Sequence, residues 1–211
     1  MVNGTQYVNQ NYPAAIRNDI TELNLSNKDL EGQLLLVNLG FNNLKKLNVS
    51  FNRLNDFTLP ATLEEFDCSN NQILSFTDSL PKAIKFNISN NSMVSFSLSA
   101  SFLSHLDVSI NLLKTLDLRS IGGNIKELNC SNNPINSLSL NYSSDLNSFD
   151  CLGIKYNKFS TSPTQTSYSF ITTTALANNS SLVGQEYLQH LRMANANAIS
   201  APNAGPHVND D

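Results

Sequence analysis

The chain has 211 residues, of which 40% are hydrophobic, and its net charge is −4 with only 13 lysines and arginines. No apolar run approaches the roughly 20 residues that cross a bilayer. The basic residues are scattered, which argues against a nucleic-acid or membrane partner. Residues 1–6 lack the features of a secretory signal, so we expect a cytoplasmic protein.

Residues 1–19 carry Tyr7, Val8, Tyr12 and Ile16 among polar residues. This pattern predicts a short amphipathic helix that ends near Tyr12-Pro13. Because a solenoid must cover its exposed first strand, we interpret residues 1–19 as an N-terminal cap.

A repeat of about 20 residues fills residues 20–159. About seven copies begin at Ile20, Leu44, Leu63, Ala83, Leu103, Ile125 and Leu146, with spacings of 19 to 24 residues. Each first residue is position one of its copy. Position four holds Leu23, Leu47, Phe66, Phe86, Leu106, Leu128 and Phe149, and position six holds Leu25, Val49, Cys68, Ile88, Val108, Cys130 and Cys151. A period in this range is typical of leucine-rich repeats.

Apolar positions four and six alternate with polar neighbours, which predicts a short strand with one buried face. Such a strand cannot bury that face alone, so neighbouring copies must pair in parallel. The expected fold is an α/β-repeat solenoid, a leucine-rich repeat horseshoe with a parallel β-sheet on its concave side. A second apolar set after each strand closes the core from the convex side, where we expect extended or 3₁₀-like turns.

Position nine is asparagine in five copies: Asn52, Asn71, Asn91, Asn111 and Asn133. A buried asparagine can donate to and accept from backbone groups that a turn leaves unpaired. We therefore interpret these residues as a structural ladder, the alternative being an exposed row that binds a ligand. Lys28 and Ile154 replace asparagine in the end copies, as specialised end repeats would.

All three cysteines occupy position six, which indicates small core residues. Cys130 and Cys151 would lie on neighbouring strands, so a disulfide between them is an alternative. Nine Asn-x-Ser/Thr sequons suggest glycosylation, but Asn24, Asn48, Asn87 and Asn129 arise from the repeat itself. The sequons are therefore not independent support for secretion.

The sequence offers no metal-ligand spacing, phosphate loop or nucleophile beside a base, so we expect no metal, no cofactor and no enzymatic activity. His105 and Asp107 lie two residues apart on one strand and would share its face. That pair could act as a general base, but solvated strand positions give the same pattern.

Positions three and five would form a broad polar row on the concave face. Such a row suits a protein or peptide partner, with charge pairing giving specificity. The candidate binding residues are Lys46, Asn48, Glu65, Asp67, Lys85, Asn87, His105, Asp107, Glu127, Asn129 and Asp150. Phe51 and Ile110, at position eight, are candidate apolar anchors at the rim, or each packs against a neighbouring turn.

Three segments near the N-terminus are distinctive: residues 6–13 (Gln-Tyr-Val-Asn-Gln-Asn-Tyr-Pro), Ile20–Leu25 and Lys28–Gly32. With repeats such as Leu-Asn-Cys-Ser-Asn-Asn at 128–133, the chain resembles fungal leucine-rich repeat proteins over residues 5–157. The resemblance implies a cytoplasmic interaction module, in some cases attached to signalling domains such as kinases. Leu-Pro segments at residues 59–60 and 80–81 resemble bacterial short-repeat effectors, which is an alternative.

The glycine at position 32, in the longer first spacing, suggests a tight turn there.

Residues 160–181 form a Ser/Thr-rich linker or a poor edge strand. Tyr187, Leu188 and Leu191 predict one amphipathic helix within residues 182–211, followed by a disordered tail from Ala201.

We conclude from the sequence that the chain is a monomeric, non-catalytic protein–protein interaction module. Two alternatives stay open. One is the recognition arm or adaptor of a signalling or ubiquitin-ligase assembly, and the other is a secreted or surface sensor or adhesin.

Overall fold

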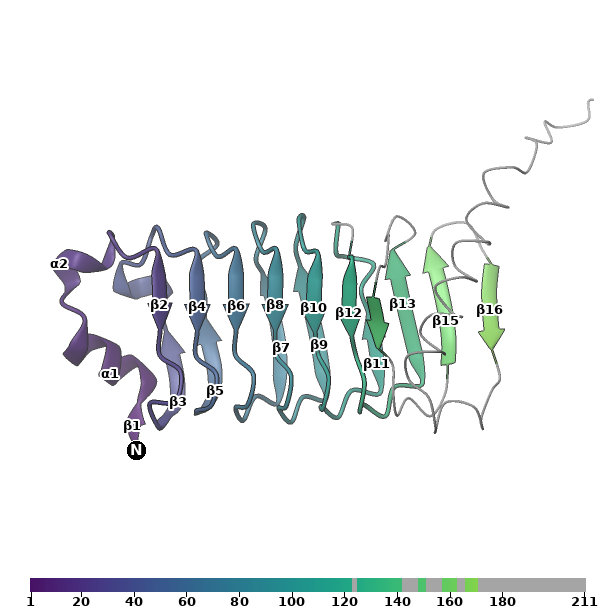
Figure 1. Ribbon diagram of the computed structural model, residues 1–211, viewed down its shortest axis with the longest axis horizontal. Helices are drawn as coiled ribbons and strands as arrows, with labels where there is room; N and C mark the ends of the chain where they lie inside the picture. Colours follow the sequence, from purple (N-terminus) through teal and green to yellow (C-terminus); the bar gives the residue numbers. More distant parts are fainter. Residues whose placement is uncertain (123–124, 142–147, 151–156, 163–165, 171–211) are drawn as a thin grey trace, which may run out of the picture.

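The chain folds into a parallel β-solenoid with little helix, seen in a computed structural model (Figure 1). The structure describes residues 1–122, 125–141, 148–150, 157–162 and 166–170, with only the backbone from Leu140 onward. No helix in these ranges is long and apolar enough to cross a membrane.

One sheet, which we name the front sheet, contains one short strand from each copy of the repeat. Every strand spans positions three to five, and all neighbours are parallel and pair at equivalent positions, such as Leu23 with Leu47 and Leu47 with Phe66. The predicted register is therefore confirmed. The strands are β2 (Glu22–Asn24), β4 (Lys46–Asn48), β6 (Glu65–Asp67), β8 (Lys85–Asn87), β10 (His105–Asp107), β12 (Glu127–Asn129) and β14 (Ser148–Asp150).

The opposite side of the solenoid is also built from strands, which lie behind the front sheet in Figure 1. They form the sheets β1-β3-β5, β7-β9 and β11-β13-β15-β16, parallel except for the antiparallel pair of β15 and β16. Their bounds are β1 (Val2–Asn3), β3 (Leu30–Leu35), β5 (Arg53–Thr58), β7 (Ser75–Ser79), β9 (Ser95–Ser99), β11 (Thr115–Asp117), β13 (Ser137–Asn141), β15 (Asn157–Ser162) and β16 (Thr166–Phe170).

These back strands confirm the expected extended conformation of the second side. Among the described residues the single 3₁₀ helix is η1 (Val37–Leu39). The tight turn expected at Gly32 is wrong, because Gly32 lies inside β3, where the pairing with β5 shifts register. Its φ of +71° suits a residue without a Cβ, which explains the glycine.

The core lies between the two sides. The position-four side chains from Leu23 to Leu128 are all 3% exposed or less, and those at position six from Leu25 to Cys130 are fully buried. Each buried leucine contributes about 1.5–3 kcal/mol. Each copy of the repeat forms one coil of the solenoid. Phenylalanine rings continue the packing from coil to coil, because the ring centroid of Phe86 lies 5.3 Å from that of Phe66 and 5.0 Å from that of Phe76.

The position-nine asparagines join each coil to the one before it. Asn111 Nδ2 donates to Ile88 O in the preceding coil (3.1 Å) and to Val108 O in its own (3.1 Å). Its Oδ1 accepts from Met93 N at 3.0 Å. Equivalent bonds are made by Asn52, Asn71, Asn91 and Asn133. The structural ladder is therefore confirmed, and the exposed ligand-binding row is wrong.

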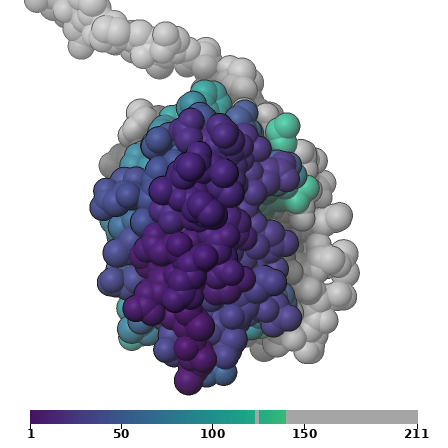
Figure 2. All heavy atoms as spheres, turned by 90° about the vertical axis from the view of Figure 1, so that its left-hand side faces the viewer, coloured from purple at the N-terminus to yellow at the C-terminus, as the bar shows by residue number. Residues whose placement is uncertain are grey.

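Two short helices lie at the N-terminal end of the stack (Figure 1), and the view from that end in Figure 2 shows the first residues, in purple, lying over the following ones. Helix α1 (Gly4–Asn11) ends where the sequence pattern predicted, and α2 (Ala14–Arg17) follows. Arg17 is only 6% exposed and donates to Tyr12 O (2.7 Å), to Leu39 O (3.1 Å) and to Asn9 Oδ1 (2.9 Å). One side chain thus ties the cap to the first coil.

Several expectations fall on the later part of the chain. Backbone of residues 160–162 and 166–170, within the Ser/Thr-rich stretch, belongs to β15 and β16. Residues 171–211, including the expected helix, lie outside the described residues, as do Cys151 and Ile154. The disulfide alternative therefore stays untested. Cys68 and Cys130 are fully buried, and burial raises the pKa of the Cys68 thiol well above its ordinary value.

Candidate functional site

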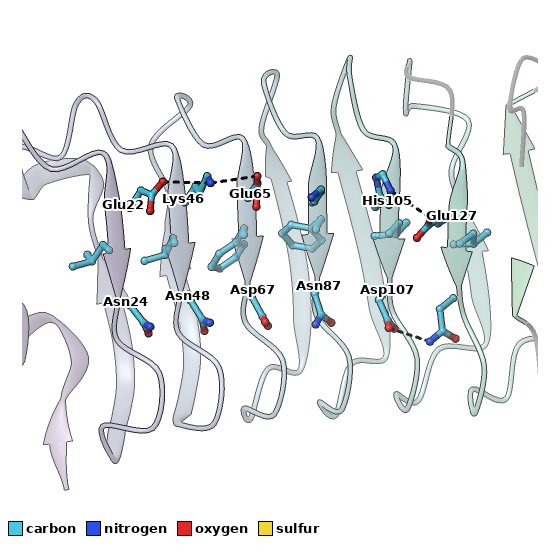
Figure 3. Close-up of a pocket in the computed structure, with 18 residues that line it drawn as sticks. Glu22, Asn24, Lys46, Asn48, Glu65, Asp67, Asn87, His105, Asp107 and Glu127 are labelled. Carbon is cyan, nitrogen blue, oxygen red and sulfur yellow. Dashed lines mark hydrogen bonds and ion pairs between the residues drawn. The ribbon is translucent and has the colours of Figure 1, made fainter. Parts of the chain in front are cut away.

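The outward face of the front sheet carries an open groove of about 950 Å³. Each strand from β2 to β12 contributes its three residues to the lining, and the polar side chains form two rows across the strands (Figure 3). Ten of the eleven candidate binding residues line the groove. Asp150 pairs in register with Asn129, but only its backbone is described. Glu22 and Asn24 also line it and were not among the candidates.

Position five uses one side-chain oxygen to shape the turn that follows each strand. Asn48 Oδ1 accepts from Ser50 N (2.9 Å) and Ser50 Oγ (2.7 Å). Asp107 Oδ1 accepts from Ser109 N (2.9 Å) and Ser109 Oγ (2.6 Å). Asparagine and aspartate are interchangeable here, because both offer this acceptor.

This turn was missed in the sequence, where the Asn-x-Ser pattern was interpreted only as a repeated sequon. The signal was present, since asparagine or aspartate followed by serine two residues later is typical of an Asx turn. Asn24, Asn87 and Asn129 make the same bonds, and Asp67 Oδ1 accepts from Ser69 N at 3.0 Å. The second atom of each amide or carboxylate is left for other partners.

Position three forms a row of charges that are mostly paired within the row. Lys46 Nζ lies 3.3 Å from Glu22 Oε1 and 3.8 Å from Glu65 Oε1, and the hydrogen bond that Lys46 donates to Glu22 raises the pKa of Lys46. Lys85 differs from Lys46, because its ammonium group makes no ion pair or hydrogen bond within the described part of the chain.

The position-five row keeps two carboxylates without a cation. Within the described ranges, neither Asp67 nor Asp107 forms an ion pair, and Asp107 Oδ2 accepts from Asn129 Nδ2 at 3.0 Å. The groove lining holds five carboxylates and two lysines, which leaves three negative charges when His105 is neutral. The groove is therefore acidic, and the two carboxylates of its position-five row lie on β6 and β10.

His105 does not contact Asp107 as a general-base pair. Its Nδ1 lies 2.7 Å from Ser104 Oγ, and its Nε2 lies 3.5 Å from Glu127 Oε1. Ser104, His105 and Glu127 thus place a hydroxyl, a base and an acid next to one another in space, as in a catalytic triad. The backbone N–H groups of Ser104 and His105 both donate to Ile84 O, however, so neither can stabilise an oxyanion beside that hydroxyl.

Phe51 and Ile110 lie on the turns beyond the strands and do not line the groove. The two residues are 62% and 49% exposed, so each presents apolar surface to solvent at the rim. Both have positive φ, 56° and 52°, at a position that is asparagine in the equivalent turns of four other coils. A β-branched isoleucine is strained in this conformation, whereas asparagine tolerates it.

The described residues hold no group of three or more His, Cys, Asp or Glu side chains that could bind a metal ion. No protein-family model and no curated protein sequence matches this chain. Its function must therefore be inferred from the geometry of the groove.

Proposed function

We propose that this chain is a non-catalytic recognition module of the leucine-rich repeat type, similar to the fungal proteins named above. It binds a protein or peptide segment on the face of its front sheet. The repeat period, the asparagine ladder and the one-strand-per-copy sheet support that type of scaffold.

The observation that carries the function is the separation of two tasks on the same strands. The inward side chains and one oxygen of each position-five residue maintain the fold, whereas the outward groups line an open groove. Side chains held by a regular parallel sheet are pre-organised, which reduces the ordering cost of binding. Phe51 and Ile110 supply exposed apolar contacts at the rim.

The test is selection of random peptides displayed on phage against the intact chain, with every selected peptide re-measured on two variants. The groove variant is Lys85→Ala/Asp107→Asn/Glu127→Ala. The control variant, Lys114→Ala/Asp56→Asn/Glu31→Ala, makes the same changes of charge outside the groove. Thermal unfolding must first show that both variants keep the stability of the wild type.

We expect selected peptides to lose binding to the groove variant and to keep it with the control. If no peptide distinguishes the two variants, the front sheet is not a recognition surface and the proposal is wrong.

A further inference from the structure

We infer that the segment bound in the groove is basic. It lies along the stacking axis and places two cationic side chains, three residues apart, against Asp67 and Asp107. This inference rests on the proposed function and specifies the chemistry of its partner.

The direction follows from the shape of the lining. Each strand contributes only three residues, but the groove crosses six strands from β2 to β12. Five spacings of about 4.8 Å give a length of roughly 24 Å along the axis. A polyproline II segment rises about 3.1 Å per residue, so about eight residues fit end to end.

The sign of the charge follows from which groups are already paired. Glu22 and Glu65 both contact Lys46, and Glu127 lies beside His105. Asp67 and Asp107 form no ion pair within the described residues, and their Oδ1 atoms are held by the turns that follow. Asp67 Oδ2, and Asp107 Oδ2 in addition to the bond that it accepts from Asn129 Nδ2, offer fixed negative charge to a partner, which favours cationic side chains at these two strands.

The spacing follows from the strand order. Asp67 lies on β6 and Asp107 on β10, with β8 between them, so the two carboxylates are about 9.6 Å apart. In polyproline II the side chains of residues i and i+3 point the same way and repeat every 9.3 Å or so. An extended β-strand places residues i and i+3 on opposite faces and fits less well.

Lys85 limits the middle of the segment. It lies on β8, between the two aspartate strands, and makes no ion pair with any described residue. A third cation facing β8 would be repelled, whereas a backbone carbonyl or a proline would not. The favoured pattern is therefore cation-x-x-cation with uncharged residues between.

The repeat itself supplies substitutions that remove charge and keep the fold. Asparagine occupies position five in four other coils and makes the same bonds to serine. Asp67→Asn/Asp107→Asn should therefore fold normally. Asp56→Asn/Asp78→Asn removes two charges from the back strands β5 and β7 and is the matched control.

The probes are fluorescein-labelled octapeptides, measured by fluorescence anisotropy at low ionic strength with the intact chain. The first is Pro-Pro-Lys-Pro-Pro-Lys-Pro-Pro. The second replaces both lysines by glutamates, and the third has the same composition with adjacent lysines. We expect the first to bind more tightly than the other two. Its affinity should fall about five- to tenfold in Asp67→Asn/Asp107→Asn and stay unchanged in the control.

A gain of affinity can also be tested. Asn24 lies on β2, two strands from β6, so Asn24→Asp extends the row with the same spacing. We expect this variant to bind a peptide with three lysines at every third residue more tightly than the wild type does. If the wild type and Asn24→Asp bind this peptide equally, the three-residue spacing of the cations is wrong. Equal binding of the first and third octapeptides to the wild type would also contradict that spacing.

The two proposals fail in different ways. If phage selection gives groove-dependent peptides that are not basic, the recognition function stands and this inference is wrong. If the first octapeptide binds the double aspartate variant as tightly as the wild type, the assignment of Asp67 and Asp107 is wrong.

Discussion

At the scale of the residue, the position-five side chains combine two roles that usually compete. One oxygen of Asp107 accepts from Ser109, which fixes the turn, while the other accepts from Asn129 Nδ2 on the groove side. The first bond is made by asparagine equally well. The charge at this position therefore varies without affecting the turn.

The asparagine ladder gives a direct prediction of stability. Asn111 is 5% exposed and bonds to backbone groups in two coils. Because Asn111→Ala leaves buried donors and acceptors unpaired, we expect the free energy of unfolding to fall by about 2–4 kcal/mol, measured by urea denaturation. Asn136→Ala, at an exposed position, is the control and should cost less than about 0.5 kcal/mol. Similar costs for both would contradict the ladder.

The strained turn at Ile110 predicts an order of stabilities. Ile110→Asn and Ile110→Ala both shorten the side chain, but only asparagine tolerates a φ of 52°. We expect the asparagine variant to be about 1 kcal/mol more stable than the alanine variant in urea denaturation. Equal stability of the two would show that this turn carries no strain. A groove partner that contacts Ile110 should also bind both variants more weakly than the wild type.

The partly buried carboxyl group of Asp78 should make the stability of the fold depend on pH. Burial raises the pKa of this carboxyl above its ordinary value of 3.8, partly opposed by a hydrogen bond from Ser79 N. The folded state therefore favours the protonated form, and ionised Asp78 destabilises the fold at neutral pH. We expect Asp78→Asn to stabilise the chain at pH 7 by less than about 1 kcal/mol. The gain should shrink as the pH falls toward about 4 and be absent below it, where the folded and unfolded states are both protonated, as measured by thermal unfolding across pH. A gain that is independent of pH would exclude this cause.

At the scale of the element, the cap depends on Arg17. We expect Arg17→Met to lower the free energy of unfolding by about 2–3 kcal/mol, because Tyr12 O and Leu39 O lose their donors. Hydrogen exchange should show lost protection in β2 and β3, with β10 unchanged, since a solenoid coil contacts only its neighbours. The control, Arg119→Met, removes an exposed partner of Asp117 and should leave these amides protected. Uniform loss of protection across all strands would contradict a local role for Arg17.

The strands of the front sheet could be predicted because Leu47, Phe66 and Phe86 mark a period that only parallel stacking satisfies. The back strands were predicted less well. Their apolar positions, such as Leu54 and Leu98, were clear, but periodicity alone did not separate a strand from a turn. Gly32 shows the same limit, because a glycine marks positive φ without saying whether a turn or a bulge requires it.

The candidate groove residues could also be predicted, because alternation along a strand decides which side chains face outward. The ion pairs between these groove residues could not be predicted from the sequence. Whether Lys46 binds Glu22 or stays open to a partner depends on side-chain geometry, and Lys85 occupies the same repeat position with no such pair. The charges that remain available to a partner therefore depend on the folded arrangement of these side chains and not on the repeat pattern alone.

At the scale of the whole molecule, the solenoid behaves as a row of neighbouring units. Phe86 lies in the middle of the phenylalanine packing, within 6.0 Å of Phe96 and 5.3 Å of Phe66 between ring centroids. We expect Phe86→Ala to cost about 3–5 kcal/mol. It should also lower the urea m-value, because the two halves then unfold less cooperatively. Asn87→Asp, one residue on, should change stability by under about 0.5 kcal/mol. An unchanged m-value would show that the coils are coupled by other contacts.

The interchangeability of asparagine and aspartate at position five has a consequence for how such a chain diversifies. Codons for the two residues differ in a single base. A point mutation can therefore add or remove one negative charge in the groove at a chosen strand while the bonds to the following serine persist. Related chains could therefore acquire different partners by successive single substitutions, each of which leaves the stability of the fold unchanged.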